Sequence, residues 1–534
     1  MNNSKTNKFF KMRIIFFALL FCSTVHAQTV SKNIIDFGAR PDGITNNTIA
    51  IQHAIDEVSK QGGGKVIVPR GRFVTGVLHL KSNVELNIHE EAVLLASTNI
   101  SDYGTSLKVS ALIVADNEKN ISITGKGLID GQSDLLINDL YVRLRKGEWY
   151  DDEWKYFNDW HQRRPSELNR PHIIHFKNCD GVTIKNIHLQ NGTCWIQNYE
   201  KCKNIIIDSI TVFSNTFWNN DGIDLVDCKN AKITHCSINC DDDGICLKSS
   251  DRNSSCENIF VANCRVRSSA SAIKLGTASR GGFKNIVIKN IEVYDTYRSA
   301  IAIESVDGGI IDGVDVKNIH AVNTGNAIFI KLGHRNKDSV YSSLRNVSIS
   351  NVKVDVPLTK PDKGYPMEGP ELKYPPTYKI DTSIVYQSVS PWNNSGIDSS
   401  AVPYPHNVFP SSISGLPGHL VENVTLQNIE INYATIAEKN ANYFPIDSFK
   451  TITEAVKDYP EFSMFGELPV WGFYVRHVKG LTMNNITVNM KGKDFRKAFL
   501  FNDVKQLLLQ HIAVEGKTEK PAMFFNDVIY ANKK

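Results

Sequence analysis

Short apolar segments recur at a regular spacing along most of the chain. Each has the pattern apolar-x-apolar-x-Asn-apolar-x-apolar, as in residues 182–189 around Asn186. Alternating apolar positions predict strands. An asparagine between two strands predicts a turn, because its side chain hydrogen-bonds nearby backbone and tolerates left-handed geometry. The same position recurs at Ser209, His235, Asn263, Asn290, Asn318, Asn351, Asn428, Asn485 and His511. Counted from Asn186, the first five intervals between successive positions are 23, 26, 28, 27 and 28 residues.

This period predicts an all-β fold, a right-handed parallel β-helix, in which each repeat forms one coil. A coil buries its apolar face only by stacking on its neighbours, and a solenoid grows along one axis. A chain of 534 residues therefore need not divide into several domains. Leucine-rich repeats share the period, but their leucine-and-asparagine signature is absent. We expect residues 28–534 to form a single β-helix domain.

The start of the repeat and its interruptions are also visible. Residues 47–60 predict a helix that covers the first coil, with Asn47 as its cap and glycines after its end. The apolar face of this helix is formed by Ile51, Ala54, Ile55 and Val58. Residues 134–171 are rich in aromatic and charged side chains, and residues 356–419 are rich in Pro, Ser, Tyr and Gly. Both interruptions indicate loops folded over one face of the β-helix.

A second strand in each coil locates the candidate chemistry. These strands begin at Gly222, Gly244, Ala272, Ala300 and Ala327, with steps of 22, 28, 28 and 27 residues. The residues just before them should therefore stack on one another, namely Asp221, Asp243, Ser271, Ser299 and Asn326. Neighbouring strands lie about 4.8 Å apart. Asp221 and Asp243 thus become close neighbours, with Asp242 beside them.

Three carboxylates in one place repel one another, which raises the pKa of at least one. A carboxyl group that stays protonated near neutral pH can donate a proton to a leaving oxygen, while ionised partners activate water. Strand parity sends further charged residues to the outer face, namely Asp224, Lys248, Lys274, Glu304 and Lys331, and by the same parity Asp242 and Arg298 point outward. An acidic cluster flanked by cations suits an anionic sugar chain.

Other interpretations of these charges remain open. The outer lysines and any single aspartate can be ordinary solvated residues. An aspartate cluster can also bind calcium, as in polysaccharide lyases of similar shape, where Arg298 would be the base. A third alternative is a carbohydrate-binding β-helix without catalysis, such as an adhesin. The stacked carboxylates disfavour that alternative, because a pure binder gains little from their repulsion.

The N-terminus predicts export. An apolar run at residues 14–22 is too short to span a bilayer and is followed by small residues suited to cleavage after Ala27. The positive charges before this run are Lys8, Lys11 and Arg13. Residues 1–27 are therefore expected to be a signal peptide, and the mature protein to be periplasmic or secreted. A membrane anchor and a lipid-modified Cys22 are the alternatives, although Phe21 is a poor residue before a lipidated cysteine.

Cysteine usage and charge exclude several functional classes. Nine cysteines follow the signal, all between residues 179 and 264, without a Cys-x-x-Cys pair. An odd number leaves at least one thiol free, and we expect most of them to be small core residues rather than zinc ligands. The 60 basic and 56 acidic residues leave a net charge of only +4, which argues against a nucleic-acid binder. We expect the protein to be a monomer that requires no metal or cofactor. Its expected partner is a polysaccharide or oligosaccharide, and we expect no contact with a membrane after the signal peptide is removed.

The aspartate motifs resemble those of glycoside hydrolase family 28, the polygalacturonase and rhamnogalacturonase family. The segment Asn219-Asn220-Asp221 resembles the family's Asn-Thr-Asp motif, and Asp242-Asp243-Gly244 resembles its Asp-Asp motif. The step of 21 residues between the motifs also fits, as do Arg170-Pro171 and Trp195 upstream. The resemblance covers most of the chain from Ile35 onward and implies a pectin-lyase-like β-helix.

The resemblance also implies a function. It implies an inverting glycosidase that acts on pectin-like acidic chains, with Asp242 as proton donor and with Asp221 and Asp243 positioning and activating water. Two family motifs are replaced: Gly-His-Gly by residues 270–272, and the Arg-Ile-Lys segment that holds a galacturonate carboxylate by residues 302–304. Cys240-Asp241 is a further departure. The candidate substrate-binding residues are Asp224, Lys248, Lys274, Arg298 and Glu304, of which Lys274 or Arg298 would supply the missing charge.

Overall fold

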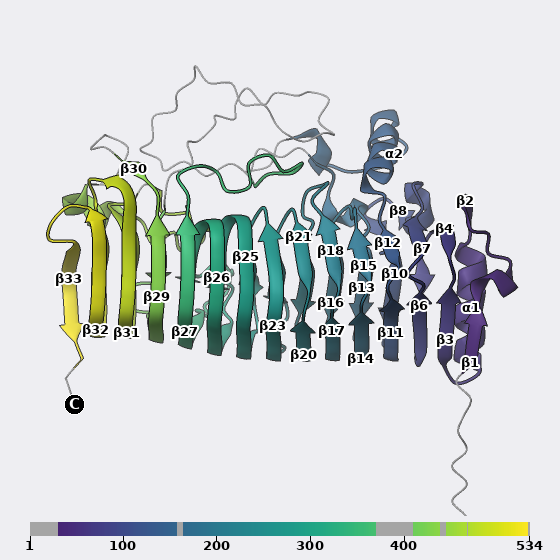
Figure 1. Ribbon diagram of the computed structural model, residues 1–534, viewed down its shortest axis with the longest axis horizontal. Helices are drawn as coiled ribbons and strands as arrows, with labels where there is room; N and C mark the ends of the chain where they lie inside the picture. The colour runs from purple at the N-terminus through teal and green to yellow at the C-terminus, as the bar shows by residue number, and fades with distance from the viewer. Residues whose placement is uncertain (1–29, 157–163, 370–408, 438–444, 467, 532–534) are drawn as a thin grey trace, which may run out of the picture.

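The chain folds into a parallel β-helix in which strands stack in register along one axis (Figure 1). The computed structural model describes residues 30–156, 164–369, 409–437, 445–466 and 468–531. One sheet assignment joins 31 strands, and every pairing within it is parallel. The predicted right-handed parallel β-helix is therefore confirmed. The predicted signal peptide at residues 1–27 lies outside the described residues.

Three series of short strands form the first coils. The series that leads to the candidate site contains β5 (Leu78–His79), β10 (Ile113–Asp116), β13 (Ile174–Lys177), β16 (Gln197–Glu200), β19 (Ile223–Val226), β22 (Ile245–Ser249) and β24 (Ile273–Ser279). The second contains β1 (Val30–Asn33), β3 (Gly64–Val68), β6 (Val84–Ile88), β11 (Lys119–Gly125), β14 (Asp180–Lys185), β17 (Lys203–Asp208) and β20 (Lys229–Thr234). The third contains β2 (Asp42–Asn46), β4 (Gly71–Thr75), β7 (Ala92–Ala96), β12 (Leu128–Asp130), β15 (His188–Gln190), β18 (Thr211–Ser214) and β21 (Ser237–Cys240).

Later coils continue these series, mostly as longer strands that bend around the axis. They are β23 (Cys256–Ser268), β25 (Gly282–Ser305), β26 (Ile310–Leu332), β27 (Ser343–Val356), β28 (Ser411–Ser414), β29 (Val421–Tyr433), β30 (Ile436–Ala437), β31 (Val470–Asp494), β32 (Lys497–Lys517) and β33 (Met523–Tyr530). A separate antiparallel pair is formed by β8 (Gly104–Thr105) and β9 (Lys108–Val109).

Helices lie at one end of the β-helix and in the connections. They are α1 (Thr48–Lys60), α2 (Ser133–Lys146), and the short 3-10 helices η1 (Ile34–Phe37), η2 (Ile100–Tyr103), η3 (Glu153–Lys155), η4 (Glu167–Asn169) and η5 (Ile446–Thr451). Helix α1 covers the first coil through the predicted apolar face (Figure 1). The predicted capping role of Asn47 is wrong. Its side chain accepts from Arg40 N at 2.7 Å instead, so it fixes the preceding loop.

The bend between two strands of each coil has the left-handed geometry that the repeat predicted. Asn263, Asn290 and Asn318 have φ of 57°, 56° and 57°. Their side chains form a column, since Asn290 Nδ2 donates to Asn263 Oδ1 at 2.9 Å and Asn318 Nδ2 donates to Asn290 Oδ1 at 2.8 Å. The column continues through Asn351, Asn428 and Asn485. Each asparagine therefore adopts the left-handed φ of its own bend and links its side chain to the bend of the next coil.

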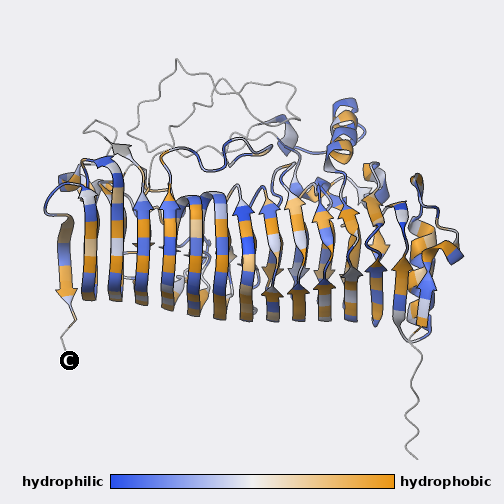
Figure 2. Cartoon of the chain, viewed as in Figure 1, coloured by the Kyte–Doolittle hydropathy of each residue, from blue (hydrophilic) through white to orange (hydrophobic). Residues whose placement is uncertain are grey.

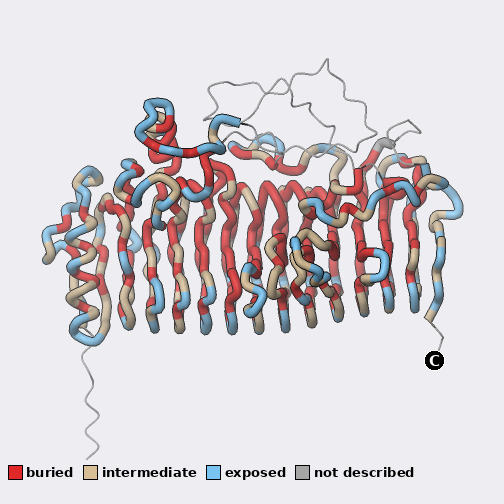
Figure 3. Tube along the Cα trace, turned by 180° about the vertical axis from the view of Figure 1, so that it is seen from behind, coloured by how far each residue is buried: buried red, intermediate tan, exposed pale blue. Residues whose placement is uncertain are grey.

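The core runs along the whole axis because apolar and polar residues alternate in every coil (Figure 2). Buried residues form a continuous band from one end to the other (Figure 3). The nine cysteines after Cys22 are all buried and unbridged, and all but Cys194 and Cys246 belong to the hydrophobic core; Cys179 N, for example, donates to Cys202 Sγ at 3.4 Å. Among the described residues, no helix has the length and apolarity needed to cross a bilayer.

The interruptions of the repeat lie beside the candidate site. The first connects β12 to β13 and contains α2, η3 and η4, and the second connects β27 to β28. Residues 157–163 of the first and residues 370–408 of the second lie outside the described part of the chain. A third long connection, between β30 and β31, contains η5 and was not expected from the sequence. Residues from the first and third connections reach the cavity described next.

Candidate active site

Two glycines allow the coils that carry the carboxylates to stack closely. A Cβ atom on Gly222 would lie 2.5 Å from the carbonyl oxygen of Gly244, so a larger residue does not fit there. Gly222 N donates to Asp243 O at 2.9 Å, and Ile223 N donates to Gly244 O at 3.0 Å. This register places Asp221, just before β19, next to Asp243, just before β22. The stacking predicted from the spacing of the strands is present.

The carboxylates line a cavity of about 230 Å³. Six of the predicted catalytic and substrate-binding residues meet in its wall: Asp221, Asp242, Asp243, Lys248, Lys274 and Arg298. The other lining residues are Arg164, Glu167, Trp195, Asn219, Asp241, Ala270, Thr277, Ala278 and Tyr459. Two other candidates, Asp224 and Glu304, lie behind the wall, each in contact with a residue that lines it.

Lys248 joins the deepest carboxylates. Its Nζ lies 2.7 Å from Asp221 Oδ2, contacts Asp224 Oδ1, and sits 3.4 Å from the centre of the Trp195 ring. Burial raises the pKa of Asp221 well above its usual value, and the neighbouring Asp224 raises it further. Burial also raises the pKa of Asp224, to about 6, although Lys248 opposes this. The expected rise in the pKa of at least one carboxyl group of the cluster is therefore found at Asp221, where burial is the largest cause and crowding by Asp224 adds to it.

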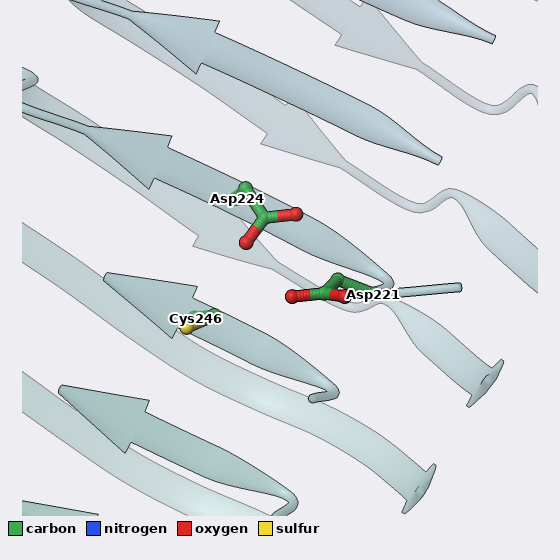
Figure 4. Close-up of side chains that lie close together, drawn as sticks. All are labelled: Asp221, Asp224 and Cys246. Carbon is green, nitrogen blue, oxygen red and sulfur yellow. The ribbon is translucent and has the colours of Figure 1, made fainter. Parts of the chain in front are cut away.

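Asp221, Asp224 and Cys246 come close enough for their side-chain ligand atoms to share one cation. Figure 4 shows the two carboxyl groups beside Cys246, which lies on the neighbouring strand β22. However, the Lys248 ammonium contacts both carboxylates. The positive charge that a metal ion would bring to this point is already supplied by the chain itself.

Asp242 is held from two sides and is the most exposed of the three predicted catalytic carboxyl groups. Its Oδ2 accepts from Asn219 Nδ2 at 3.2 Å, and its Oδ1 accepts from Asp243 N at 3.0 Å. The buried Arg170 fixes this Asn219, since Arg170 Nη2 donates to Asn219 Oδ1 at 2.7 Å. Asp242 is partly exposed, whereas Asp221 and Asp243 are each only 3% exposed. Asp242 is thus the member of the cluster best placed to meet a ligand.

The pKa of Asp242 moves in the opposite direction from that of Asp221. Burial alone would raise the pKa of Asp242, but nearby cations outweigh burial and the pKa is lowered. The strongest of these cations are Arg298, Lys274 and Lys248. The pKa values of Asp221 and Asp242 are therefore moved apart, the first upward and the second downward.

A second ion pair fixes Asp243. Lys274 Nζ lies 2.9 Å from Asp243 Oδ2, and Ser271 N donates to Asp243 Oδ1 at 3.2 Å. Lys274 Nζ also donates to Tyr459 Oη at 3.1 Å. Ser271 occupies the segment in which the resembling family carries a histidine. In this chain, a backbone amide and a lysine hold the carboxylate instead.

The outer charges are not a solvated face, and that interpretation is wrong. Lys248, Lys274 and Lys331 are 8%, 2% and 0% exposed, because connecting segments cover this side of the strands. Lys331 lies away from the cavity beside Phe465, and burial lowers its pKa to about 7. Burial raises the pKa of Glu304 to about 7, and Glu304 accepts from Thr277 Oγ1 at 3.1 Å.

Several residues in or beside the wall were not predicted to take part in catalysis or substrate binding. Tyr459 lines the cavity, and Glu461 lies 4.0 Å from Arg298 Nε; both come from the connection between β30 and β31. Arg164 comes from the first interruption. Asp241 lines the cavity too, and burial together with Asp242 raises its pKa well above the usual value. The run of three aspartates at residues 241–243 could have pointed to Asp241. Nothing in the repeat pattern pointed to Tyr459, Glu461 or Arg164.

Comparison with known proteins gives a family and a fold. A family model described as glycosyl hydrolases family 28 matches residues 59–357, more than half of the chain. A probable polygalacturonase of Vitis vinifera is 30% identical over 330 residues, which are 58% of this chain and 59% of that protein. An exo-poly-alpha-D-galacturonosidase of Dickeya chrysanthemi is 26% identical over 325 residues, which are 52% and 53%. The chain thus spans a little over half the length of these relatives.

A solved structure agrees with the architecture. A hyperthermoactive exopolygalacturonase from Thermotoga maritima is similar with a TM-score of 0.54 at 23% sequence identity. The match covers 76% of this chain and 87% of that one. At this level of identity the likeness shows the fold alone.

Proposed function

Because the chain belongs to glycosyl hydrolase family 28, we propose that it hydrolyses glycosidic bonds in pectin-like acidic polysaccharides or oligosaccharides, with inversion at the anomeric carbon. The observation that carries this proposal is the cluster of Asp221, Asp242 and Asp243 in one cavity wall, with cations around it. Paired carboxyl groups with separated pKa values are what acid–base hydrolysis of a glycoside requires.

In the proposed mechanism Asp242 donates the proton to the leaving oxygen, while Asp221 and Asp243 hold and activate the water. Interacting carboxyl groups titrate as a unit, so a proton can change its place within the cluster. An acidic sugar entering the cavity adds negative charge near the cations that lower the pKa of Asp242. The pKa of Asp242 then rises, and the proton moves toward the group that must deliver it.

The decisive experiment compares two leaving groups in Asp242→Asn. Asparagine is nearly isosteric but cannot donate the proton, and general acid catalysis contributes about 100- to 10,000-fold. The variant should lose that factor on a natural oligosaccharide. It should recover much of its rate on a glycoside with an activated leaving group, which needs little protonation. Equal slowing on both substrates would remove Asp242 as the acid and make Asp221, whose pKa is raised, the next candidate.

The products distinguish hydrolysis from the other activities. Incubation of the wild type with pectic oligosaccharides, with and without a chelator, should give new reducing ends without unsaturated sugars and without dependence on calcium. Calcium-dependent unsaturated product would indicate a lyase. Absence of any product from a broad pectic panel would leave a carbohydrate-binding β-helix.

We further propose that the protein acts outside the cytoplasm on plant cell-wall material, as a monomer without membrane attachment. The support for export is the sequence of residues 1–27, with its basic start, its apolar run and the small residues suited to cleavage after Ala27. N-terminal sequencing of the exported protein should begin at Gln28. Retention of the apolar run, or lipid attachment at Cys22, would contradict this proposal.

A further inference from the structure

Four cations line the cavity, and three of them already meet a carboxylate. These pairs are Lys248 with Asp221 at 2.7 Å, Lys274 with Asp243 at 2.9 Å, and Arg298 with Glu461 at 4.0 Å. An incoming anion would have to compete with these internal partners. In particular, displacing Asp243 from Lys274 would disturb a carboxylate that the proposed mechanism needs.

Arg164 differs from the other three cations. Its Nη1 atom is buried and has no hydrogen-bond partner, and no ion pair joins it to any carboxylate in the described part of the chain. Burial lowers the pKa of this guanidinium and the charge of nearby Arg170 lowers it further, while the attraction of Glu167 and Asp242 only partly opposes them. A buried, charged N–H group without an acceptor is costly. Such a group in a cavity wall indicates a ligand that brings the acceptor with it.

We propose that Arg164 binds the carboxylate of an acidic sugar residue in the cavity and is the main determinant of specificity for acidic over neutral sugars. This inference rests on the proposed glycosidase function. The segment in which the family carries cations for this purpose is Ala302-Ile303-Glu304 here, and its only charge is negative. A guanidinium presents a planar fork of donors that matches a carboxylate.

The position of Arg164 links recognition to catalysis. Arg164 precedes η4 in the first interruption and approaches the cavity from outside the coils, while the carboxylates belong to the coils themselves. Arg164 is also one of the cations that lower the pKa of Asp242. A sugar carboxylate bound to Arg164 cancels part of that effect, so a correctly charged substrate favours protonation of the proposed acid.

Binding measurements can test this assignment without turnover. In an Asp242→Asn background, calorimetry would compare trigalacturonic acid with its fully methyl-esterified form. Adding Arg164→Gln should raise the Kd for the acid roughly tenfold or more and leave the Kd for the ester within about twofold. Arg164→Lys should retain part of the preference. Arg145→Gln is the matched control, because Arg145 lies exposed on α2 in the same interruption.

The outcomes separate this inference from the proposed function. Thermal denaturation first confirms that each variant is folded. Equal weakening of both ligands by Arg164→Gln, weakening of neither, or failure of trigalacturonic acid to bind before Arg164 is changed would overturn the assignment of Arg164. Failure of the wild type to release reducing ends would overturn the glycosidase proposal, while the comparison of acid with ester would still decide the role of Arg164.

Discussion

Replacing Lys248 with methionine should destabilise the fold strongly near neutral pH and much less in acid. Lys248 contacts Asp221 and Asp224, and the three side chains are 10%, 4% and 0% exposed. Methionine occupies a similar volume but leaves two buried carboxyl groups without a cation. Removing one partner of a buried ion pair costs about 3–5 kcal/mol, and we expect a loss of this size in the free energy of unfolding near pH 7.

The pH dependence follows from the two carboxyl groups. Burial raises the folded-state pKa of Asp224 from 3.8 to about 6 even with Lys248 present, and the pKa of Asp221 is also raised. Without the lysine both should rise further, so the folded variant binds more protons than its unfolded chain. Stability then falls as pH rises from the unfolded pKa through the folded pKa. Below that window both carboxyls are protonated in both states, and the variant loses little.

Denaturant unfolding followed by tryptophan fluorescence, at about pH 4 and about pH 7.5, measures this difference. Lys229→Met is the matched control. Its partner Glu257 lies 3.4 Å away, and the two side chains are 51% and 32% exposed, so stability should change little at either pH. An equal loss for Lys248→Met at both pH values, or a loss below about 1 kcal/mol at the higher one, would refute the role given to this lysine.

Two further substitutions test the geometry of the coils. Gly222→Ala places a Cβ atom 2.5 Å from Gly244 O, so it should lower the free energy of unfolding, measured with denaturant, by about 1–3 kcal/mol. It should also lower activity, because it separates the coils that carry Asp221 and Asp243. Asn318 has a backbone φ of 57°, and its side chain donates to Asn290 at 2.8 Å, so Asn318→Ala should destabilise the fold by about 1–3 kcal/mol. Asn318→Gly should destabilise less, because glycine adopts this φ without strain. Equal losses of stability in the two variants would contradict a contribution from backbone strain.

The carboxylate cluster was predictable because parallel coils stack in register. Once the strand starts at Gly222 and Gly244 were aligned, Asp221 and Asp243 had to be neighbours. The asparagine bends were predictable for the same reason, since one side-chain type performs the same backbone task in every coil. Both features depend on local sequence and on the neighbouring coil alone.

The burial of the outer charges was not predictable in this way. Strand parity tells which side of a strand Lys274 faces, but not what covers that side. Lys274 is covered in part by Tyr459, which lies 185 residues later in the chain. Tyr459 belongs to the connection between β30 and β31, which does not follow the repeat, so the sequence pattern did not predict its position. Asn47 shows the same limit on a small scale. Its position at the start of α1 was predicted, but a loop amide competes successfully for its side chain.

The asparagine column also governs how a molecule of this kind can change its length over evolutionary time. Each coil contacts only its neighbours, so a duplicated coil that keeps an asparagine at its bend can join the stack beyond the cavity as an interchangeable unit. A coil gained between β19 and β25 would instead move Asp221 about 4.8 Å away from Arg298. Added coils should therefore be tolerated toward the ends of the β-helix, whereas the number of coils between β19 and β25 should be fixed.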